Sequence, residues 1–545
     1  MTTAIDHHDL IVVGAGFAGL YTVIHAERLG LDVLGLEAGS GVGGTWYWNR
    51  YPGARCDVES IDYSFSFDPQ LEREWRWSER YATQPEILRY LEHVADRYDV
   101  RRHYRFDQRV ASAQWHERAQ RWEVRTEAGL VATADWLVMA TGSLSAPVLP
   151  DLPGRDTFAG EVYMTAAWPQ TDPALAGKRV AVIGTGSSGI QAIPLIAQQA
   201  AEVVVYQRTA NYSVPAFNRG LEDAEWQAAL ADYAHRRELS WNGLAGSPWT
   251  SHPVPYDEVP EAEREAVFEE AWTRGGVLFA KAFARQTADI EINEAARAFF
   301  EGKLGELVDD PQTLADLTPS DHPIGTKRIC TDSGYYETYN LPHVHLVNLR
   351  REPITEVTPT GITSAQAHRE HDVVVYATGF DAMTGALTSI DIRGREGRSL
   401  RDEWRDGPTN YLGVGIPGFP NLLALNGPGT PSVLSNMALG AEQQGAFALR
   451  LMEHCRANGF TSAEPRSDAA QAWAAHGAEL ANATLFGSAR SWYTGANIEG
   501  KARGFLPYIG GFRPYIDRCD AVADEGFAGF VLSERRPVAV PVAAV

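Results

Sequence analysis

The sequence predicts an α/β fold with two Rossmann-like dinucleotide-binding domains and a helical insertion in the second. Two glycine-rich fingerprints support this, Gly14-Ala15-Gly16-Phe17-Ala18-Gly19 and Gly184-Thr185-Gly186-Ser187-Ser188-Gly189. Each follows a short apolar run, at residues 10–13 and 180–183, and precedes a helical pattern, which is the context of a phosphate-binding βαβ turn. Between residues 220 and 320, a stretch rich in Ala, Glu and Arg has helical periodicity and indicates the insertion.

The residue that ends the second strand differs in charge between the two units. In the first unit a strand at residues 32–36 is followed by Glu37, whereas Arg208 takes the corresponding place in the second unit. A carboxylate accepts hydrogen bonds from both hydroxyls of an unmodified ribose, and an arginine can pair with a 2′-phosphate. We therefore expect the first unit to bind FAD and the second to bind NADPH.

Length and charge narrow the class of protein. At 545 residues the chain is too long for one hydrophobic core and suggests about three structural units. A formal charge of −22 argues against nucleic-acid or membrane partners, because both attract basic surfaces. No apolar stretch approaches the roughly 20 residues that span a bilayer, and the N-terminus lacks the pattern of a signal peptide. These observations favour a monomeric cytoplasmic enzyme.

The cysteines exclude one chemistry that also combines FAD with NADPH. Cys56, Cys330, Cys455 and Cys519 are scattered, and no Cys-x-x-Cys pair is present, so the dithiol chemistry of disulfide reductases is disfavoured. Sparse, unpaired cysteine also suits a reducing cytoplasm. No metal-ligand spacing occurs, and the histidines at positions 7 and 8 are expected in a frayed terminus.

A repeated tripeptide predicts how the domains alternate along the chain. Ala-Thr-Gly ends two apolar strands, at residues 140–142 and 377–379, which suggests paired crossings between the two dinucleotide-binding domains. Pro147, Pro150 and Pro153 mark the first linker. We expect the FAD-binding domain at 1–144 and 382–545, the NADP-binding domain at 145–214 and 325–381, the helical insertion at 215–324, and a loose tail at 537–545.

A long motif follows the first βαβ unit. Residues 43–57 read Gly-Gly-x-Trp, four residues, Tyr-Pro-Gly, three residues, Asp. Further motifs are Gly-Thr-Lys-Arg at 325–328, Ala-Thr-Gly-Phe-Asp at 377–381 and Ser-Trp-Tyr-Thr-Gly-Ala-Asn at 491–497. In these residues the chain resembles the type I Baeyer-Villiger monooxygenases, and looks closest to the branch of phenylacetone, cyclohexanone and steroid monooxygenases.

The resemblance implies an NADPH-dependent flavoprotein oxidoreductase with FAD, O2 and a small-molecule ketone as its partners. One oxygen atom of O2 enters beside the carbonyl through a C4a-peroxyflavin and gives an ester or a lactone. Negative charge moves onto the former carbonyl oxygen, so the site needs a cation that keeps its proton, as arginine does. Arg328 matches the family's catalytic arginine, and Asp57 would pair with it near the flavin. Residues 208–213 and 275–283 look most like the steroid branch, which suggests cyclic or bulky ketones.

The resemblance and the fingerprints together give the expected binding residues. For FAD these are Gly14, Ala15, Gly16, Phe17, Gly19, Glu37, Gly44, Thr45, Trp46, Asp57, Tyr63, Val110 and Met437. For NADP they are Arg55, Thr185, Gly186, Ser187, Ser188, Gly189, Gln191, Arg208, Thr209, Lys327, Arg328 and Trp492, with Arg208, Thr209 and Lys327 at the 2′-phosphate. Leu434, Ser435 and Met437 are expected beside the substrate.

The same residues also allow other interpretations. Asp57 could cap a helix, and Thr45, Trp46 and Tyr63 could serve core packing alone. The whole chain could instead be a flavin-containing N- or S-oxygenase, or a non-catalytic FAD-binding sensor. The intact Arg208 and Lys327 argue against a sensor, because a sensor has no need to bind a 2′-phosphate.

One position departs from the family pattern. The shorter fingerprint Phe-x-Gly-x-x-x-His-x-x-x-Trp-Pro appears at residues 158–169 with Met164 in place of the histidine. In the family this segment joins the two nucleotide-binding domains. We therefore expect the substitution to affect coupling between the domains more than the flavin chemistry.

Overall fold

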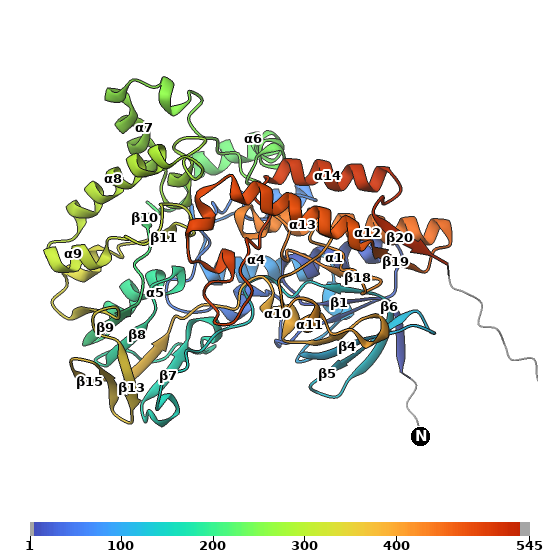
Figure 1. Cartoon of the computed structure of the whole chain (residues 1–545), viewed down its shortest axis with the longest axis horizontal. Helices are drawn as coiled ribbons and strands as arrows, with labels where there is room; N and C mark the ends of the chain where they lie inside the picture. The colour runs from blue at the N-terminus through green and yellow to red at the C-terminus, as the bar shows by residue number, and fades with distance from the viewer. Residues whose placement is uncertain (1–4, 535–545) are drawn as a thin grey trace, which may run out of the picture.

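The structure, a computed structural model, describes residues 5–534 and contains two α/β halves that lie side by side. Figure 1 shows one sheet at the right and the other at the left, each with helices packed against it. The predicted α/β class with two Rossmann-like domains is confirmed, although two strand pairs of the first sheet are antiparallel. The tail expected at 537–545 lies outside the described residues.

The first sheet contains strands from both ends of the chain. Its order is β17-β4-β5-β6-β1-β2-β3, with β18 paired to β6. The strands are β1 (Asp6–Val13), β2 (Val33–Leu36), β3 (Tyr104–Arg105), β4 (Val110–His116), β5 (Arg121–Thr126), β6 (Val131–Met139), β17 (Asp391–Arg393) and β18 (Leu422–Ala424). This half of the molecule is therefore built from two separated parts of the chain.

The second sheet has the order β12-β9-β8-β16-β7. Its strands are β7 (Glu161–Met164), β8 (Arg179–Ile183), β9 (Glu202–Gln207), β12 (Val344–Asn348) and β16 (Val373–Tyr376). Smaller sheets join β10 (Ser213–Pro215) to β11 (Cys330–Asp332), β13 (Ile354–Thr358) to β14 (Gly361–Ser364) and β15 (His368–Glu370), and β19 (Ser462–Pro465) to β20 (Phe530–Ser533).

Helices cover both sheets and extend from the second half. They are α1 (Phe17–Arg28), α2 (Thr45–Trp48), α3 (Pro69–Glu74), α4 (Gln84–Arg97), α5 (Ser187–Ala197), α6 (Asp223–Asn242), α7 (Glu261–Arg274), α8 (Ile290–Leu307), α9 (Pro311–Leu317), α10 (Gly385–Thr388), α11 (Leu400–Glu403), α12 (Met437–Asn458), α13 (Ser467–Asn482) and α14 (Phe512–Asp524). Among residues 5–534, none of these helices is both long and apolar enough to cross a membrane.

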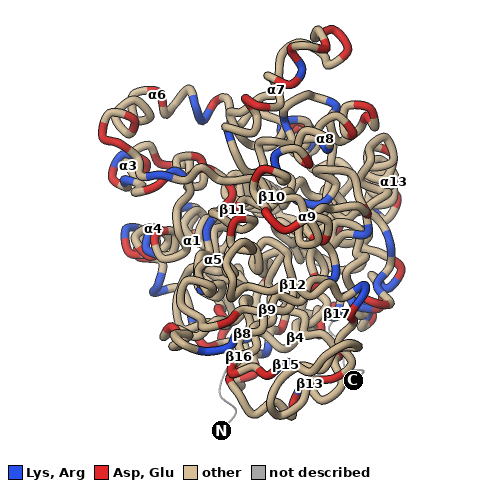
Figure 2. The backbone as a smooth tube through the Cα atoms, turned by 90° about the vertical axis from the view of Figure 1, so that its left-hand side faces the viewer, with Lys and Arg blue, Asp and Glu red and all other residues tan. Residues whose placement is uncertain are grey.

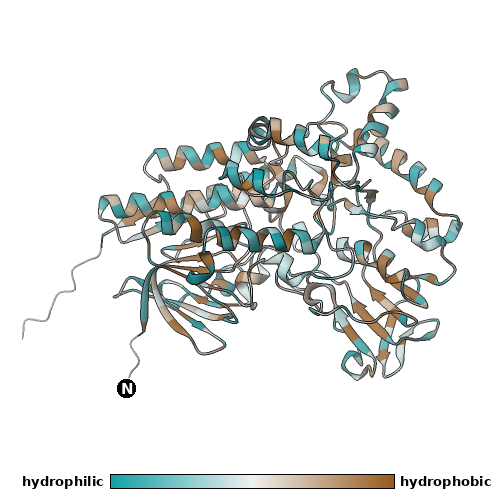
Figure 3. Ribbon diagram, turned by 180° about the vertical axis from the view of Figure 1, so that it is seen from behind, coloured by the Kyte–Doolittle hydropathy of each residue, from teal (hydrophilic) through white to brown (hydrophobic). Residues whose placement is uncertain are grey.

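The central strands of both sheets are apolar on both faces. In β1 the residues from Leu10 to Val13 are buried, and in β8 those from Val180 to Ile183 are buried. Figure 3 shows the corresponding hydrophobic colour in the sheets. Parallel sheets covered by helices on both faces need such continuous apolar runs. The first strand begins earlier than expected, because His7 and His8 belong to β1 and pair with Thr133 and Ala134, so the expectation of a frayed terminus there was wrong.

The repeated Ala-Thr-Gly tripeptides have a structural reason. Gly14 has a φ of 109°, and a Cβ atom on it would lie 2.5 Å from the carbonyl oxygen of Ala140. Gly184 has a φ of 110°, and a Cβ atom on it would lie 2.4 Å from the carbonyl oxygen of Ala377. In both halves the end of a neighbouring strand therefore packs directly against the first glycine of the fingerprint.

The two crossings between the halves lie side by side. The amide of Val148 donates to the carbonyl of Gly379 at 3.0 Å, and the amide of Asp381 donates to the carbonyl of Ala146 at 2.8 Å. An antiparallel bridge joins Pro147 to Phe380. The pair of crossings suggested by the sequence is thus present, whereas the five domain limits stay a prediction.

The region expected as a helical insertion divides between the halves. The hydrophobic cluster around α7 and α8 also contains buried residues of β8, β9 and α5. Helix α6 packs instead with the first half, where Trp226 and Tyr233 join the cluster of α1 and α4. Figure 2 shows Lys and Arg interspersed with Asp and Glu over these outer helices.

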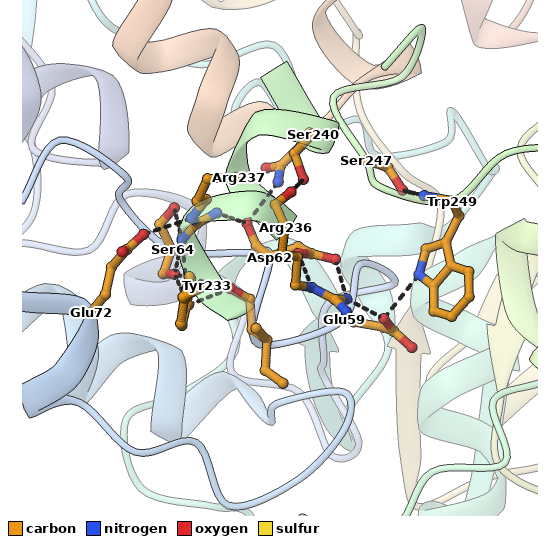
Figure 4. Close-up of polar contacts among 12 residues, drawn as sticks. Glu59, Asp62, Ser64, Glu72, Tyr233, Arg236, Arg237, Ser240, Ser247 and Trp249 are labelled. Carbon is orange, nitrogen blue, oxygen red and sulfur yellow. Dashed lines mark hydrogen bonds and ion pairs between the residues drawn. The ribbon is translucent and has the colours of Figure 1, made fainter. Parts of the chain in front are cut away.

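Ion pairs with little exposure hold α6 against the loop that follows the long motif (Figure 4). Arg236 contacts Glu59 at 2.7 Å and Asp62 at 2.6 Å. Arg237, which is 6% exposed, contacts Glu72 at 2.7 Å and also donates to the carbonyl of Asp62 at 3.0 Å. Each of these carboxylates has an arginine of α6 as its partner, so α6 is tied both to the loop and to α3, which contains Glu72.

Gly19→Ala tests the packing of the first fingerprint. A Cβ atom on Gly19 would lie 1.9 Å from the carbonyl oxygen of Gly14, so α1 cannot keep its position. We expect the purified variant to lose bound FAD, measured by flavin absorbance. Gly477→Ala is the matched control, because a Cβ atom on this glycine of α13 would have no neighbouring atom within 4 Å. It should retain FAD and gain about 0.5–1 kcal/mol of stability. Full flavin content in Gly19→Ala would contradict the prediction.

Candidate active site

Glu37 has the environment expected at a ribose-binding position. Its side chain is 5% exposed and accepts hydrogen bonds from the amides of Ala15 at 2.8 Å and Gly39 at 2.7 Å. Burial raises the pKa of the Glu37 carboxyl, while the two amides oppose this shift. A Cβ atom on Gly44 would lie 2.8 Å from the Cα atom of Gly16, so the turn and the long motif meet backbone to backbone. This acceptor beside a glycine turn fits a dinucleotide with free ribose hydroxyls.

The aromatic residues of the long motif pack together beside this turn. The indole of Trp46 donates to the hydroxyl of Tyr63 at 3.3 Å, and the rings of Phe17 and Tyr63 lie 5.1 Å apart between centroids. Thr45 is the first residue of α2. These contacts are those of core packing, and a contact with FAD stays a prediction. Val110 is buried at the start of β4, two residues after Gln108, whose amide donates to the carbonyl of Glu37.

The second fingerprint leaves room for a phosphate. A Cβ atom on Gly186 would have no neighbouring atom within 4 Å. The hydroxyl of Thr185 donates to the carbonyl of Thr209 at 3.1 Å, which ties the turn to the end of β9. Ser187 and Ser188 begin α5, so their amides stand at its N-terminus.

Arg55 and Gln191 meet between the two halves. The side-chain amide of Gln191 donates to the carbonyl of Arg55 at 3.3 Å, and the hydroxyl of Tyr51 donates to Gln191 at 2.9 Å. The guanidinium of Arg55 pairs with Glu79 at 3.2 Å. The long motif of the first half therefore packs directly on helix α5 of the second.

Two cations share one carboxylate at the end of the second sheet, and the charge of Arg208 acts on one of them. Lys327 Nζ lies 3.8 Å from an oxygen of Asp321, and Arg350 pairs with the same carboxylate. Arg350 also donates to the carbonyl of Arg208 at 3.2 Å. Burial lowers the pKa of Lys327, and the nearby charges of Arg208 and Arg350 lower it further. An excess of cations at this position fits a phosphate group.

Arg328 and Asp57 form the central ion pair of the site. The guanidinium Nε contacts one carboxylate oxygen at 2.6 Å and a terminal nitrogen contacts the other at 2.8 Å. Burial acts against the charge of Arg328, but Asp57 outweighs it and holds the pKa of Arg328 above its usual value. Asp57 lies in a bend and caps no helix, so the capping alternative was wrong.

Two further groups complete the surroundings of Arg328. The carbonyl of Val433 accepts from the guanidinium at 2.5 Å. Burial raises the pKa of the Tyr493 hydroxyl to about 12, and Arg328 opposes this rise. Tyr493 is therefore neutral at physiological pH and stands beside a permanent cation.

A cavity of about 320 Å³ opens beside this pair. Its wall includes Asp57, Arg328, Leu434, Ser435 and Tyr493, so two of the three expected substrate residues lie on it. Met437 is absent from the wall and lies at the start of α12, where its sulfur contacts the hydroxyl of Ser432 at 3.7 Å. Trp492 is also absent from the wall and packs against Tyr493, with ring centroids 4.2 Å apart.

Sequence reasoning missed Arg350, Val433 and Tyr493. Tyr493 directly follows Trp492 in a recognised motif, so its neighbour supplied a signal. Val433 acts through its backbone carbonyl, which no side-chain pattern reveals. Arg350 follows a strand far from both fingerprints, and only the register of β12 beside β9 brings it near Arg208.

Met164 ends β7, the edge strand of the second sheet. It stands opposite Tyr376 of β16 and is partly buried. Tyr376 is followed by Ala377, whose carbonyl packs against the second fingerprint. The position of the missing histidine thus adjoins the second crossing. In the part of the chain that the structure describes, no group of three or more His, Cys, Asp or Glu could hold a metal ion.

Comparisons with known proteins agree with this geometry. A family model described as pyridine nucleotide-disulphide oxidoreductase matches residues 11–220. All four cysteines of this chain are free and buried, so the disulfide chemistry in that description has no counterpart here.

Relatives and solved structures match almost the whole chain. A Baeyer-Villiger monooxygenase from Pseudooceanicola batsensis is 40% identical over 96% of both chains. A phenazine N-monooxygenase from Lysobacter antibioticus is 40% identical, over 96% of this chain and 97% of its own. The structure of an oxidised steroid monooxygenase bound to NADP is 52% identical, with a TM-score of 0.93, and the match covers 97% of this chain and 100% of that one. The chain therefore belongs to the Baeyer-Villiger monooxygenases, a family of FAD- and NADPH-dependent oxidoreductases.

Proposed function

We propose that the protein uses NADPH and O2 to insert one oxygen atom beside the carbonyl of a cyclic or bulky ketone, which gives an ester or a lactone. The observation that carries this proposal is the bidentate pair of Arg328 and Asp57 on the wall of the cavity. A fixed cation beside a cavity of about 320 Å³ suits a reaction in which a carbonyl oxygen gains negative charge.

The chain's own residues would bind the two cofactors. Glu37 would hold the ribose of FAD, and the turns at Gly14 and Gly184 would let the backbone approach the phosphates. Arg208, Lys327 and Arg350 would hold the 2′-phosphate. When bound, the two cofactors supply the electrons that activate O2. The protein's own contribution to the oxygen insertion is to hold the ketone with its carbonyl oxygen beside Arg328.

Arg328 would stabilise the negative charge that develops on the carbonyl oxygen. An arginine keeps its proton over the whole working pH range, so it acts here as a fixed charge and donates hydrogen bonds without proton exchange. Asp57 would orient the guanidinium by accepting hydrogen bonds from two of its nitrogens, and the Val433 carbonyl would accept one from the third. Trp492, packed on Tyr493, would help to close the site against water.

Oxygenation of a ring nitrogen is the second candidate. It is favoured by the phenazine N-monooxygenase, which is 40% identical over nearly the full length. A non-catalytic sensor has no such support, because the relatives at this identity are named as monooxygenases.

We also propose that the protein works as a monomer in a reducing compartment. All four cysteines are free and buried, which suits a cytosol that keeps thiols reduced. The strongly acidic charge of −22 supports the monomer, because like charges repel at contacts between copies.

The first test is a product assay. The FAD-loaded protein with NADPH and O2 should convert a panel of ketones, from small cyclic to polycyclic, to products that gain one oxygen atom. Mass spectrometry after hydrolysis identifies an ester or a lactone. Phenazine and a thioether are included in the same assay. Formation of N-oxide or sulfoxide products without any ester would reject the proposal.

Arg328→Lys tests the fixed guanidinium. Lysine keeps a positive charge but cannot contact both oxygens of Asp57, so the charge is misplaced. We expect ester formation to fall about 100-fold in kcat, the size typical for loss of a charge-stabilising donor. Flavin content should not change. An ester-forming rate equal to that of the wild type would show that the pair is structural.

Arg350→Ala tests the cation that sequence reasoning missed. We expect KM for NADPH to rise about fivefold to tenfold with little effect on NADH, because one charged contact to phosphate is lost. Arg351→Ala is the matched control, since this neighbour pairs with Asp316 instead. Equal effects on NADPH and NADH would remove Arg350 from the phosphate site.

A further inference from the structure

A second cation lies on the wall of the same cavity. Lys281 ends the short helix η5 (Gly276–Lys281) and lines the cavity together with Arg328. The two residues come from separate segments of the chain, and Arg328 already forms an ion pair with Asp57. In the proposed ketone oxidation Arg328 stabilises the carbonyl oxygen, and Lys281 has no role.

The hydrogen bonds of Lys281 are incomplete. Its Nζ atom donates to the carbonyl of Trp249 at 3.0 Å, and within residues 5–534 it forms no ion pair, although the charge of Asp62 acts on it. An ammonium group has three N–H donors, and leaving them without acceptors away from bulk water costs free energy. Burial lowers the pKa of Lys281 to about 8, so the group carries its proton at neutral pH.

The acidic residues on the wall have other partners. Glu59 pairs with Arg80 at 2.7 Å and with Arg236 at 2.7 Å. Asp62 pairs with Arg236 at 2.6 Å (Figure 4). The charge of Asp62 opposes the lowering of the Lys281 pKa, but neither carboxylate forms an ion pair with Lys281 among the described residues. Water or a ligand oxygen in the cavity can therefore accept from the remaining N–H groups of Lys281.

The remaining wall combines apolar side chains with the polar side chains of Tyr81, Ser247, Thr287, Ser435, Asn436, Tyr493 and Tyr508, none of which is charged like Lys281. Leu244, Leu278 and Ile509 are apolar, and the indole nitrogen of Trp249 already donates to Glu59 at 2.9 Å. A ligand that reaches both Arg328 and Lys281 therefore needs an oxygen acceptor at two places, with apolar atoms between them.

We propose that the cavity prefers ketones that carry a second oxygen acceptor, and that Lys281 donates a hydrogen bond to this distal oxygen while the reacting carbonyl lies at Arg328. The inference rests on the proposed ketone oxidation and names the substrate class of that site. Lys281 is then a specificity-determining residue, because its contact lies away from the reacting atoms.

A purely structural role is the competing explanation. Lys281 holds the carbonyl of Trp249, and Trp249 is itself a wall residue, so removal of the ammonium could simply loosen the wall. Such loosening would affect every substrate of similar size. A contact with a distal oxygen would affect only substrates that have one.

The test compares two ketones that differ in one oxygen. The first is a cyclohexanone with a cyclohexyl ring para to the carbonyl, and the second carries a hydroxyl at the far end of that ring. Both are measured with the FAD-loaded wild type, Lys281→Met, Lys281→Arg and Lys178→Met. Lys178 is the matched control, because it pairs with Glu161 on the edge strand β7 and is absent from the cavity wall. Isothermal titration gives dissociation constants, and ester formation gives kcat and KM.

We expect the wild type to favour the hydroxylated ketone about tenfold in affinity and in kcat/KM, the size of one charge-assisted hydrogen bond. Lys281→Met should abolish this preference through KM and leave the plain ketone within about twofold, while Lys281→Arg should restore part of it and Lys178→Met should keep it. No preference in the wild type, or equal losses for both ketones in Lys281→Met, would overturn the inference. A preference in binding without any ester would leave the role of Lys281 standing and reject the proposed function instead.

Discussion

The site depends on one ion pair that joins two distant parts of the chain. Asp57 is the last residue of the long motif in the first half, and Arg328 lies two residues before β11. Each group alone would lose solvation without compensation, so the pair is stable only when both segments are in place. The paired crossings near Val148 and Gly379, and the contact of Arg55 with Gln191, fix the halves so that this happens. The cavity forms beside the pair.

The same rule of charge compensation organises the rest of the wall. Glu59 and Asp62 are held by Arg236, which makes α6 a part of the site although it begins far along the chain. Because Glu59 and Asp62 are paired with arginines, neither carboxylate forms an ion pair with Lys281. Lys281 therefore lacks an ion-pair partner among the described residues, and a ligand oxygen can accept one of its hydrogen bonds.

Local signals predicted the fold well because they reflect local geometry. The fingerprints mark turns in which Gly14 and Gly184 meet the carbonyls of Ala140 and Ala377, and this contact also explains the repeated Ala-Thr-Gly. Predictions failed where pairing with another strand decided the outcome, as for His7 and His8, which β6 draws into β1.

The sequence by itself determined the α/β class and the two nucleotide-binding turns, because short local motifs encode them. The resemblance of further motifs to a known family predicted Arg328 and Asp57 as partners. Only the tertiary structure decided that Val433, Tyr493 and Arg350 join the site and that Met437 lies off the cavity wall. These placements depend on backbone groups and on the register between strands distant in sequence. Contacts of this kind arise from tertiary packing, within each half as well as between the halves, and short sequence motifs do not encode them.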